Sequence, residues 1–230
     1  MRLNEHSRPI LNKHSSWRMI LIIHLKEANL MPPAKFDREQ VLRSAMTTFV
    51  QKGYSKTSMQ DLTKSTGLHP GSIYCAFENK RGLLLAALLQ YKSDSELSFE
   101  TYFSHDLPVL QSLKQYLDSI VEDCAQKEGH KACLLTRALT EIADQDGEIK
   151  SVISESLYDW QKAFHKQFEL AVESKELSPE CDIPHMARYL SMGIYGLRTF
   201  AQTQTTRDVL QALADQLFDD IRRLSLATSN

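Results

Sequence analysis

Residues 57–80 read TSMQDLTKSTGLHPGSIYCAFENK, and this stretch decides the fold. It predicts two short helices. The first begins at Thr57 or Ser58, because either side chain can form a capping box with the polar residue three positions further on, and it ends at Gly67. The second begins at Pro70, which suits the first position of a helix because that position needs no backbone donor. Two short helices joined by a tight turn that contains glycine are typical of a helix-turn-helix.

The residues on either side of this stretch complete a small core. A helix is expected over residues 36–53, and Asn79 is expected to cap a longer helix that follows it. Ile73 and Phe77 stand four residues apart, so they share one face of the second short helix and are expected to pack with Leu62. The side chains between them then face outward.

The composition favours helices throughout the chain. Of its 230 residues, 42% are hydrophobic, and glycine and proline, at 8 and 7 residues, are too scarce for the many tight turns of a β-rich protein. Beyond residue 93, apolar residues recur at helical spacing in five further segments. We therefore predict an all-α protein of about nine helices, in which a three-helix unit is joined by a linking helix to a helical bundle. The five segments span residues 107–124, 132–143, 152–171, 186–200 and 210–224.

Charge is distributed unevenly along the chain. Residues 35–92 hold nine Lys and Arg against four Asp and Glu, whereas residues 93–230 hold thirteen against twenty-three. A basic segment joined to an acidic one indicates that the first binds a polyanion and that the second does not. A chance bias in surface charge is the alternative.

The sequence gives no signal for export or membrane insertion. The four cysteines show no Cys-x-x-Cys pairing, which is typical of reduced thiols in the cytoplasm. The apolar stretch from Trp17 to Leu25 is too short to span a membrane, and no small-residue cleavage site follows it. We therefore expect a cytoplasmic protein with no membrane contact.

The segment quoted above resembles the DNA-binding signature of the TetR/AcrR family of transcriptional regulators. The likeness lies in a Thr/Ser helix cap, the turn glycine, the run Gly-Ser-Ile-Tyr, a Phe three residues later and the Lys that opens the next helix. It implies a helix-turn-helix DNA-binding domain over residues 35–80 and a ligand-binding and dimerisation domain over residues 81–225. It also implies a homodimeric repressor that binds a palindromic operator in double-stranded DNA and is released by a small-molecule or electrophile signal.

Residues of this segment also have physical reasons to contact DNA. A helix enters the major groove only if its exposed face is narrow, and small residues such as Gly71, Ser72 and Cys75 keep it so. Tyr74 offers a hydroxyl to a phosphate oxygen, and Lys80 places its charge at a helix N-terminus, which attracts phosphate. The alternatives are that Tyr74 fills the core and that Lys80 is only solvated. The predicted DNA-contacting residues are Thr57, Ser58, His69, Pro70, Gly71, Ser72, Tyr74, Cys75 and Lys80.

The first 34 residues are predicted to be a disordered or mis-assigned extension. They are polar and irregular around one apolar patch, and a compact helical pattern begins only after Met31-Pro32-Pro33. One hypothesis is that Met31 is the true start of the protein. The alternative is a disordered arm whose basic residues touch DNA.

An aromatic stripe in the second half is the first candidate for effector contacts. Trp160, Phe164 and Phe168 recur at helical spacing in one predicted helix, and Tyr158 and His165 add polar groups beside them. Such stripes are more often plain core than pocket lining, and both interpretations stay open.

Cys133 is the second candidate. It stands near the start of a predicted helix, close to His130 and Lys131, and a helix N-terminus with nearby cations favours the reactive thiolate form of a cysteine. TetR-like proteins with a similar recognition segment carry a Gly-Cys-Leu-Leu-like sequence at this point. The thiol is therefore either a sensor of oxidants or electrophiles or a structural residue.

The last two predicted helices are assigned to the dimer interface by the resemblance. Leu210, Leu217 and Leu224 are spaced by seven residues, and Gly193 and Gly196 allow close helix approach. Operator DNA itself requires a dimer, because two recognition helices must reach half-sites about one or more turns apart. The alternative is that these residues form the core of a single chain. The predicted interface comprises Leu190, Gly193, Leu197, Leu210, Leu213, Leu217 and Ile221.

Other classes of protein fit the sequence less well. It shows no nucleophile–base set, no glycine-rich phosphate loop and no HExxH motif, so an enzyme is not expected. Eight histidines without metal-ligand spacing predict neither a metal site nor another cofactor. A helix-turn-helix that no longer binds DNA and a TetR-like activator are the remaining alternatives. The effector, the operator sequence and the regulated genes are not predicted, since His69-Pro70 and Cys75-Ala76 depart from the common pattern of the family.

Overall fold

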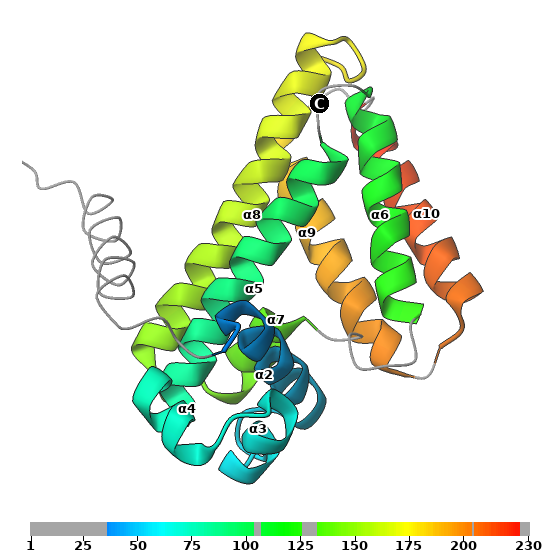
Figure 1. Cartoon of the computed structure of the whole chain (residues 1–230). Helices are drawn as coiled ribbons and strands as arrows, with labels where there is room; N and C mark the ends of the chain where they lie inside the picture. The colour runs from blue at the N-terminus through cyan, green and yellow to red at the C-terminus, as the bar shows by residue number, and fades with distance from the viewer. Residues whose placement is uncertain (1–35, 104–106, 126–132, 204, 226–230) are drawn as a thin grey trace, which may run out of the picture. The chain divides into compact units, whose positions relative to one another are not determined.

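All the regular secondary structure in the described part of the chain is helical (Figure 1). Contacts group Glu39–Asn230 into one compact unit. The described part holds nine α-helices, one short 3-10 turn and no strand, which confirms the prediction of an all-α protein with about nine helices. None of these helices is long and apolar enough to cross a membrane. The computed structural model describes residues 36–103, 107–125, 133–203 and 205–225.

The helix boundaries follow the sequence pattern with two differences. α5 continues to Tyr102, because Phe99 and its neighbours add a buried face beyond the linking segment. α8 begins at Gly147, earlier than the apolar pattern indicates, because the Asp146 side chain caps it by accepting from two backbone N–H groups. The predicted extension, residues 1–34, lies outside the described residues. The helices are α2 (Arg38–Lys52), α3 (Met59–Thr66), α4 (Pro70–Phe77), α5 (Lys80–Tyr102), α6 (Val109–Ala125), α7 (Leu134–Glu141), α8 (Gly147–Glu173), α9 (Ile183–Phe200) and α10 (Arg207–Leu224).

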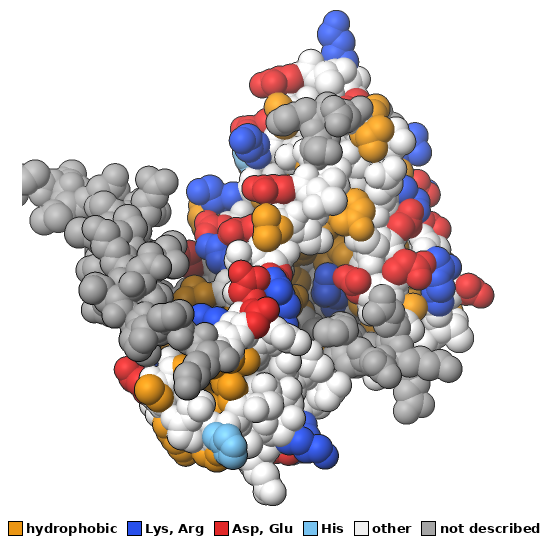
Figure 2. All heavy atoms as spheres, viewed as in Figure 1, with side chains coloured by type: hydrophobic (Ala, Val, Ile, Leu, Met, Phe, Trp, Pro, Cys, Tyr) orange, Lys and Arg blue, Asp and Glu red, His pale blue; other side chains and the backbone are white. Residues whose placement is uncertain are grey.

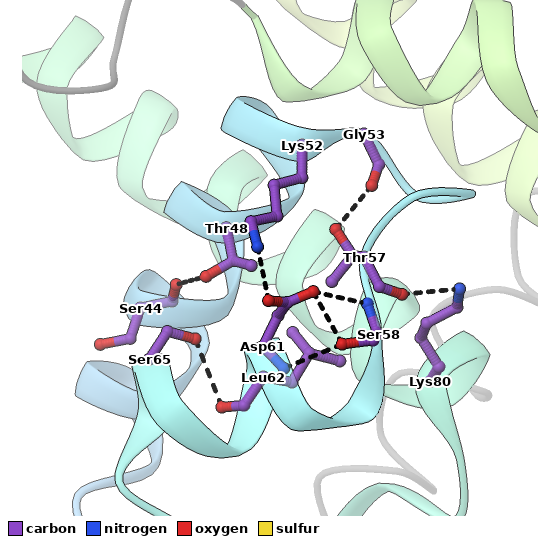
Figure 3. Close-up of polar contacts among 10 residues, drawn as sticks. All are labelled: Ser44, Thr48, Lys52, Gly53, Thr57, Ser58, Asp61, Leu62, Ser65 and Lys80. Carbon is purple, nitrogen blue, oxygen red and sulfur yellow. Dashed lines mark hydrogen bonds and ion pairs between the residues drawn. The ribbon is translucent and has the colours of Figure 1, made fainter.

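The capping of α3 resolves one of the alternatives left by the sequence (Figure 3). Ser58 forms the capping box: its Oγ accepts from the backbone N–H of Asp61 at 3.1 Å, and its own N–H donates to the Asp61 carboxylate at 2.9 Å. Thr57 is not the cap, because its Oγ1 donates instead to the carbonyl of Gly53 at 2.6 Å. α3 ends at Gly67, whose φ of 70° is the left-handed conformation that favours glycine.

α4 and the start of α5 are fixed by close packing. Ile73 and Phe77 are buried, as predicted, together with Leu62 of α3. Asn79 caps α5 by accepting from the backbone N–H of Gly82 at 2.9 Å. A Cβ at Gly82 would lie 2.1 Å from the Phe77 carbonyl oxygen, so only glycine fits where the two helices meet. The helix-turn-helix is therefore joined to α5 by a tight, sequence-specific junction.

A second core lies among the longer helices. Phe164 of α8, Leu117 of α6 and Ile194 of α9 are fully buried in it. α6 packs against α10, and α9 packs against both α8 and α10. This bundle supplies the walls of the cavity described below.

The dimer interface predicted from α9 and α10 is wrong for most of its residues. A Cβ at Gly193 would lie 2.5 Å from Leu217 Cδ1, so the close helix approach takes place within one chain. The interpretation as a single-chain core is therefore correct for these positions, because α9 and α10 pack directly on each other and on α6. Leu213 differs from the other leucines of the set, since 43% of it is exposed. The buried members are Leu190, Leu197, Leu210, Leu217 and Ile221.

Candidate functional site

α4 presents an uncharged outer face made of small and polar residues. Ile73 and Phe77 anchor the helix, and Tyr74 between them is 50% exposed, which excludes its interpretation as core filler. On the face seen in Figure 2, acidic side chains gather over the longer helices rather than over α3 and α4. Such a face fits the major groove of DNA better than a bulky or acidic one. The other exposed residues of the face are His69, Pro70, Gly71, Ser72 and Cys75.

The prediction that Thr57 contacts DNA is wrong for its side chain. Only 1% of Thr57 is exposed, and its hydroxyl is bonded to Gly53. Its backbone N–H also donates within the chain, to the carbonyl of Gly53 at 3.2 Å. Thr57 therefore fixes the connection between α2 and α3, while Ser58, the actual cap, is exposed beside it.

The Lys80 ammonium group forms contacts within the protein that the sequence does not indicate. Its Nζ donates to the carbonyls of Tyr54 and Thr57, each at 3.0 Å, and lies 4.3 Å from the centre of the Tyr54 ring. Since an ammonium group has three N–H donors, two are already bonded. The phosphate contact predicted for Lys80 stays a prediction and depends on the third.

Two exposed lysines near α3 were not singled out from the sequence. Lys56 precedes α3 and Lys64 lies in its last turn, and neither forms an ion pair with another described residue. Lys52, in contrast, lies 2.5 Å from Asp61, and this contact is the main reason why the pKa of Asp61 is well below its usual value. The basic excess of this segment could have indicated Lys56 and Lys64, but their exposure could not be predicted.

A cavity of about 200 Å³ lies among α5, α6, α7, α8 and α9. Cys133 and Trp160, both predicted effector contacts, line it. The sequence analysis missed most of the wall, because these side chains come from different helices and no local pattern links them. The polar groups that it missed are Tyr91, Lys92, Ser95, Glu96, Glu100, Tyr116, Ser156, Asp159, Tyr195 and Arg198.

The phenols of the cavity are neutral hydrogen-bonding groups. Burial is the main cause that raises the pKa of Tyr91, Tyr116 and Tyr195 above the usual value of a phenol. The Tyr116 hydroxyl accepts from Trp160 Nε1 at 3.2 Å. Each of the three therefore keeps its hydroxyl proton at neutral pH.

Four of the predicted effector contacts do not line the cavity. Tyr158 is 58% exposed and lies beside Lys162, and His165 forms a surface contact with Glu169 at 3.3 Å. Phe164 and Phe168 are buried in the core, as the alternative interpretation of the stripe held. Side chains on different faces of one helix point in different directions. The exposed residues Tyr158 and His165 therefore do not reach the cavity that Trp160 lines.

Cys133 is the residue that precedes α7, and it is buried with 6% exposure. The Tyr91 hydroxyl donates to its Sγ at 3.5 Å. The nearby cations invoked from the sequence, His130 and Lys131, lie outside the described residues. Cys133 therefore faces a ligand-sized cavity, although its proposed reactivity is untested.

Known protein families match both parts of the chain. The family described as bacterial regulatory proteins, tetR family, matches residues 41–87, and the one described as tetracyclin repressor-like, C-terminal domain, matches residues 109–217. The chain belongs to the TetR family. It is a DNA-binding transcriptional regulator.

Relatives of the regulator match it over most of their length. It is 29% identical over 184 residues to the HTH-type transcriptional repressor ComR of Escherichia coli (strain K12), covering 79% of this chain and 87% of the relative. It is 27% identical over 182 residues to the HTH-type transcriptional regulator YezE of Bacillus subtilis (strain 168), covering 79% and 94%. Among solved structures, a cysteine mutant of the TetR family regulator CifR, complexed with 26-bp double-strand operator DNA, has a TM-score of 0.73 at 22% identity and covers 82% of this chain and 98% of that one. At this identity the structural likeness concerns the fold.

Proposed function

We propose that the regulator is a homodimeric repressor that binds a palindromic operator through α4 and is released when a small molecule enters the cavity. The observation that carries the proposal is the outer face of α4, where small and polar residues are exposed between the buried anchors Ile73 and Phe77. Regulators of this family bind DNA as homodimers. Repression is favoured over activation because the relative ComR is a repressor.

The proposal divides the chain into a DNA-binding part, residues 35–80, and a ligand-binding and dimerisation part, residues 81–225. The protein acts in the cytoplasm, where its four free cysteines stay reduced. It binds and releases DNA and carries out no catalysis.

The residues of α4 divide into base and phosphate contacts. His69 and Ser72 face outward at the N-terminal half of the helix, which is the part that contacts base edges in this kind of motif, and Cys75 faces outward about one turn further on. Tyr74 offers its hydroxyl to a phosphate oxygen, and such a contact positions the protein without encoding sequence. The Ser58 hydroxyl donates to the Asp61 carboxylate at 2.7 Å, so a phosphate contact of Ser58 requires that this bond be exchanged.

The experiment that tests DNA binding is an electrophoretic shift with DNA from the protein's own promoter. We expect saturable binding, and its affinity should fall steeply as salt rises, because bound phosphates release counterions. Binding that is absent, or that is unchanged between low and high salt, would contradict the contacts proposed here.

We propose a revised dimer surface on the outer side of α9 and α10. The close contact of Gly193 with Leu217 sets the register of the two helices. Three residues from this contact, Gly196 on α9 corresponds to Ala214 on α10, which directly follows Leu213. Leu213 and Met192 are exposed apolar residues of the kind that an interface covers. Leu213→Asp should yield a monomer in light scattering, whereas Leu97→Asp, at a leucine of α5 that is more exposed than Leu213, should remain a dimer.

The route from cavity to DNA runs through α7. Cys133 and Leu135, at its start, line the cavity. Glu141, at its end, accepts from the backbone N–H of Ser55 between α2 and α3 at 3.3 Å and from Arg137 at 3.0 Å. A ligand that moves the start of α7 therefore shifts the helix-turn-helix, and a dimer whose two α4 helices no longer match the operator dissociates.

Cys133 supports a second kind of signal, an electrophile or oxidant that modifies the thiol. Its position on the cavity wall gives a small reagent a place to bind beside it. If Cys133→Ser retains full release from DNA by such reagents, sensing through this thiol is excluded.

A further inference from the structure

Arg198 is the most deeply buried charged residue of the cavity wall, and it lacks a close carboxylate partner. It comes from α9, lines the cavity, and leaves only 18% of its side chain exposed. Its contact with Asp123 spans 4.0 Å, which is too long for a hydrogen bond, and Asp123 is itself 55% exposed. No other described carboxylate lies within 4.0 Å of this guanidinium. A buried guanidinium normally has a well-aligned carboxylate partner, because its desolvation is costly.

The groups around Arg198 are neutral hydrogen-bond donors. Burial disfavours the charge of Arg198, but a guanidinium stays protonated in proteins, so Arg198 remains a cation beside the neutral phenols of Tyr91 and Tyr116. This part of the wall therefore offers one fixed cation and neutral phenols, which is a donor set for an anion with two oxygens. A guanidinium pairs with a carboxylate through two parallel N–H···O bonds.

The acidic residues of the lining lie elsewhere on the wall. Lys92 is 2.6 Å from Asp159 and 3.9 Å from Glu96, so these charges compensate one another. Glu96 and Glu100 are exposed and mark the solvent side. Among the acidic residues of the lining, none lies within 4.0 Å of the Arg198 guanidinium, and Asp123, which is outside the lining, is the one described carboxylate at that distance.

The size and remaining lining of the cavity restrict the rest of the ligand. A dry cavity of about 150 Å³ holds one benzene molecule. A volume of about 200 Å³ therefore accommodates one ring and a small substituent. Phe99, Trp160 and Leu135 supply apolar and aromatic surface for such a ring.

We propose that the effector site takes a small aromatic monocarboxylate whose carboxylate pairs with Arg198 and whose ring lies against Trp160 and Phe99. This inference rests on the proposed function, since it names the ligand class of the same cavity. The bound carboxylate takes the place of Asp123 as the partner of Arg198. Tyr91, whose hydroxyl donates a hydrogen bond to Cys133 just before α7, contacts the same anion and so links it to α7.

The test compares carboxylates with neutral molecules of the same shape. Binding of benzoate, 4-hydroxybenzoate and trans-cinnamate to the full chain is measured by calorimetry and by Trp160 fluorescence, with benzamide and methyl benzoate as neutral counterparts. We expect at least one carboxylate to bind with a Kd below ~1 mM and at least ~10-fold more tightly than its neutral counterpart, as a charge-assisted pair provides. Equal affinity for both, or no carboxylate below ~1 mM, would overturn the proposal.

Variants of α9 assign the preference to Arg198. Arg198→Met should remove the preference for the carboxylate and leave benzamide binding unchanged, whereas Arg188→Met, at an exposed arginine of the same helix, should bind as the wild type does. Should Arg198→Met not fold, Arg198→Lys, which keeps the charge and loses the two-pronged geometry, should retain part of the preference. A variant without a charge at position 198 that still prefers benzoate would overturn the proposal.

DNA binding by the ligand-free protein separates the two proposals. If the free regulator binds its promoter DNA but no carboxylate binds the cavity, the ligand class is wrong and the DNA function stands. If a carboxylate binds through Arg198 without releasing DNA, the ligand class stands and the role of the cavity in release is wrong.

Discussion

The outer face of α4 and the cavity between α5 and α9 achieve their binding properties in opposite ways. α4 has eight residues, is held by two buried side chains, and exposes all of its remaining residues except the partly buried Ala76. The cavity draws its walls from five helices and keeps Arg198 and three phenols largely away from solvent. The first site is a local surface that a partner must approach, and the second is an interior that depends on long-range packing.

Because the two regions are separate, a change in the cavity can affect α4 only through the elements that join them. α7 extends from the cavity to the connection between α2 and α3, and the Arg81 guanidinium at the start of α5 binds Asp146 ahead of α8 at 2.9 Å. Substitutions at the junction should therefore disturb both regions, whereas those within one region should leave the other intact.

The largest expected effect comes from the junction itself. Gly82→Ala places a Cβ against the Phe77 carbonyl, so either α4 or α5 must shift. We expect a loss of about 2–3 kcal/mol in the free energy of unfolding, as for overpacked sites, measured by urea denaturation.

Gly71→Ala is the matched control for this variant. Gly71 lies in the first turn of α4, as Gly82 lies in that of α5, but a Cβ there meets nothing within 4 Å. It should be neutral or stabilise the protein by up to about 1 kcal/mol. A Gly82→Ala variant as stable as the wild type would show that the junction is looser than described.

A smaller effect is expected at Asp146, which combines an ion pair and a helix cap. Its carboxylate accepts from Arg81 and from the backbone N–H groups of Glu148 and Ile149. Asp146→Ala removes both and should cost about 1–2 kcal/mol. Asp146→Asn keeps a capping oxygen and loses only the ion pair with the partly exposed Arg81. This loss should cost under about 1 kcal/mol. Equal losses would mean that the cap contributes nothing.

The same residue gives a pH dependence with a defined sign. The hydrogen bond from Arg81 is the main cause that lowers the pKa of Asp146 to about 2. Because this pKa lies below the unfolded value of about 3.9, the carboxylate stabilises the fold above that value, and its contribution is lost as the pH falls through about 2. The melting temperature of the wild type should therefore fall more steeply than that of Asp146→Asn between about pH 4 and pH 2.

The smallest effects should separate the two regions most cleanly. Tyr74→Phe removes one exposed hydroxyl, so affinity for promoter DNA should fall about 5–10-fold, in line with one hydrogen bond, with no change in melting temperature. Tyr91→Phe removes a buried hydroxyl from the cavity and should leave DNA binding by the free protein unchanged. If Tyr91→Phe weakened DNA binding as much as Tyr74→Phe does, the two regions would not be separable.

How much could be predicted from the sequence differs between the regions for the same physical reason. A capping box at Thr57 or Ser58, the start at Pro70 and the anchors Ile73 and Phe77 depend on neighbours within a few residues, so the sequence predicted them. Thr57 was misassigned because two adjacent residues can each cap a helix, and only the bond to Gly53 decides between them.

The cavity and the dimer surface could not be predicted in this way. Arg198 and Tyr91 lie far apart in the sequence, and only the packing of α5 against its neighbours brings them to one wall. Helical spacing shows that Leu217 and Leu213 of α10 are both apolar, but it does not show that Leu217 is buried and Leu213 is exposed. Apolar periodicity cannot distinguish a neighbour in the same chain from one in a second copy.

The most direct test of the central claim is the affinity of Ser72→Glu for DNA from the protein's own promoter. Ser72 is exposed on α4, so the substitution places a carboxylate against the DNA phosphates without disturbing the core. We predict a loss of at least ~100-fold in affinity, with the melting temperature and oligomeric state of the wild type. Ser93→Glu, at an exposed position of α5, should bind DNA as the wild type does. A Ser72→Glu protein that binds this DNA within about twofold of the wild type would contradict the assignment of α4 as the DNA-binding surface.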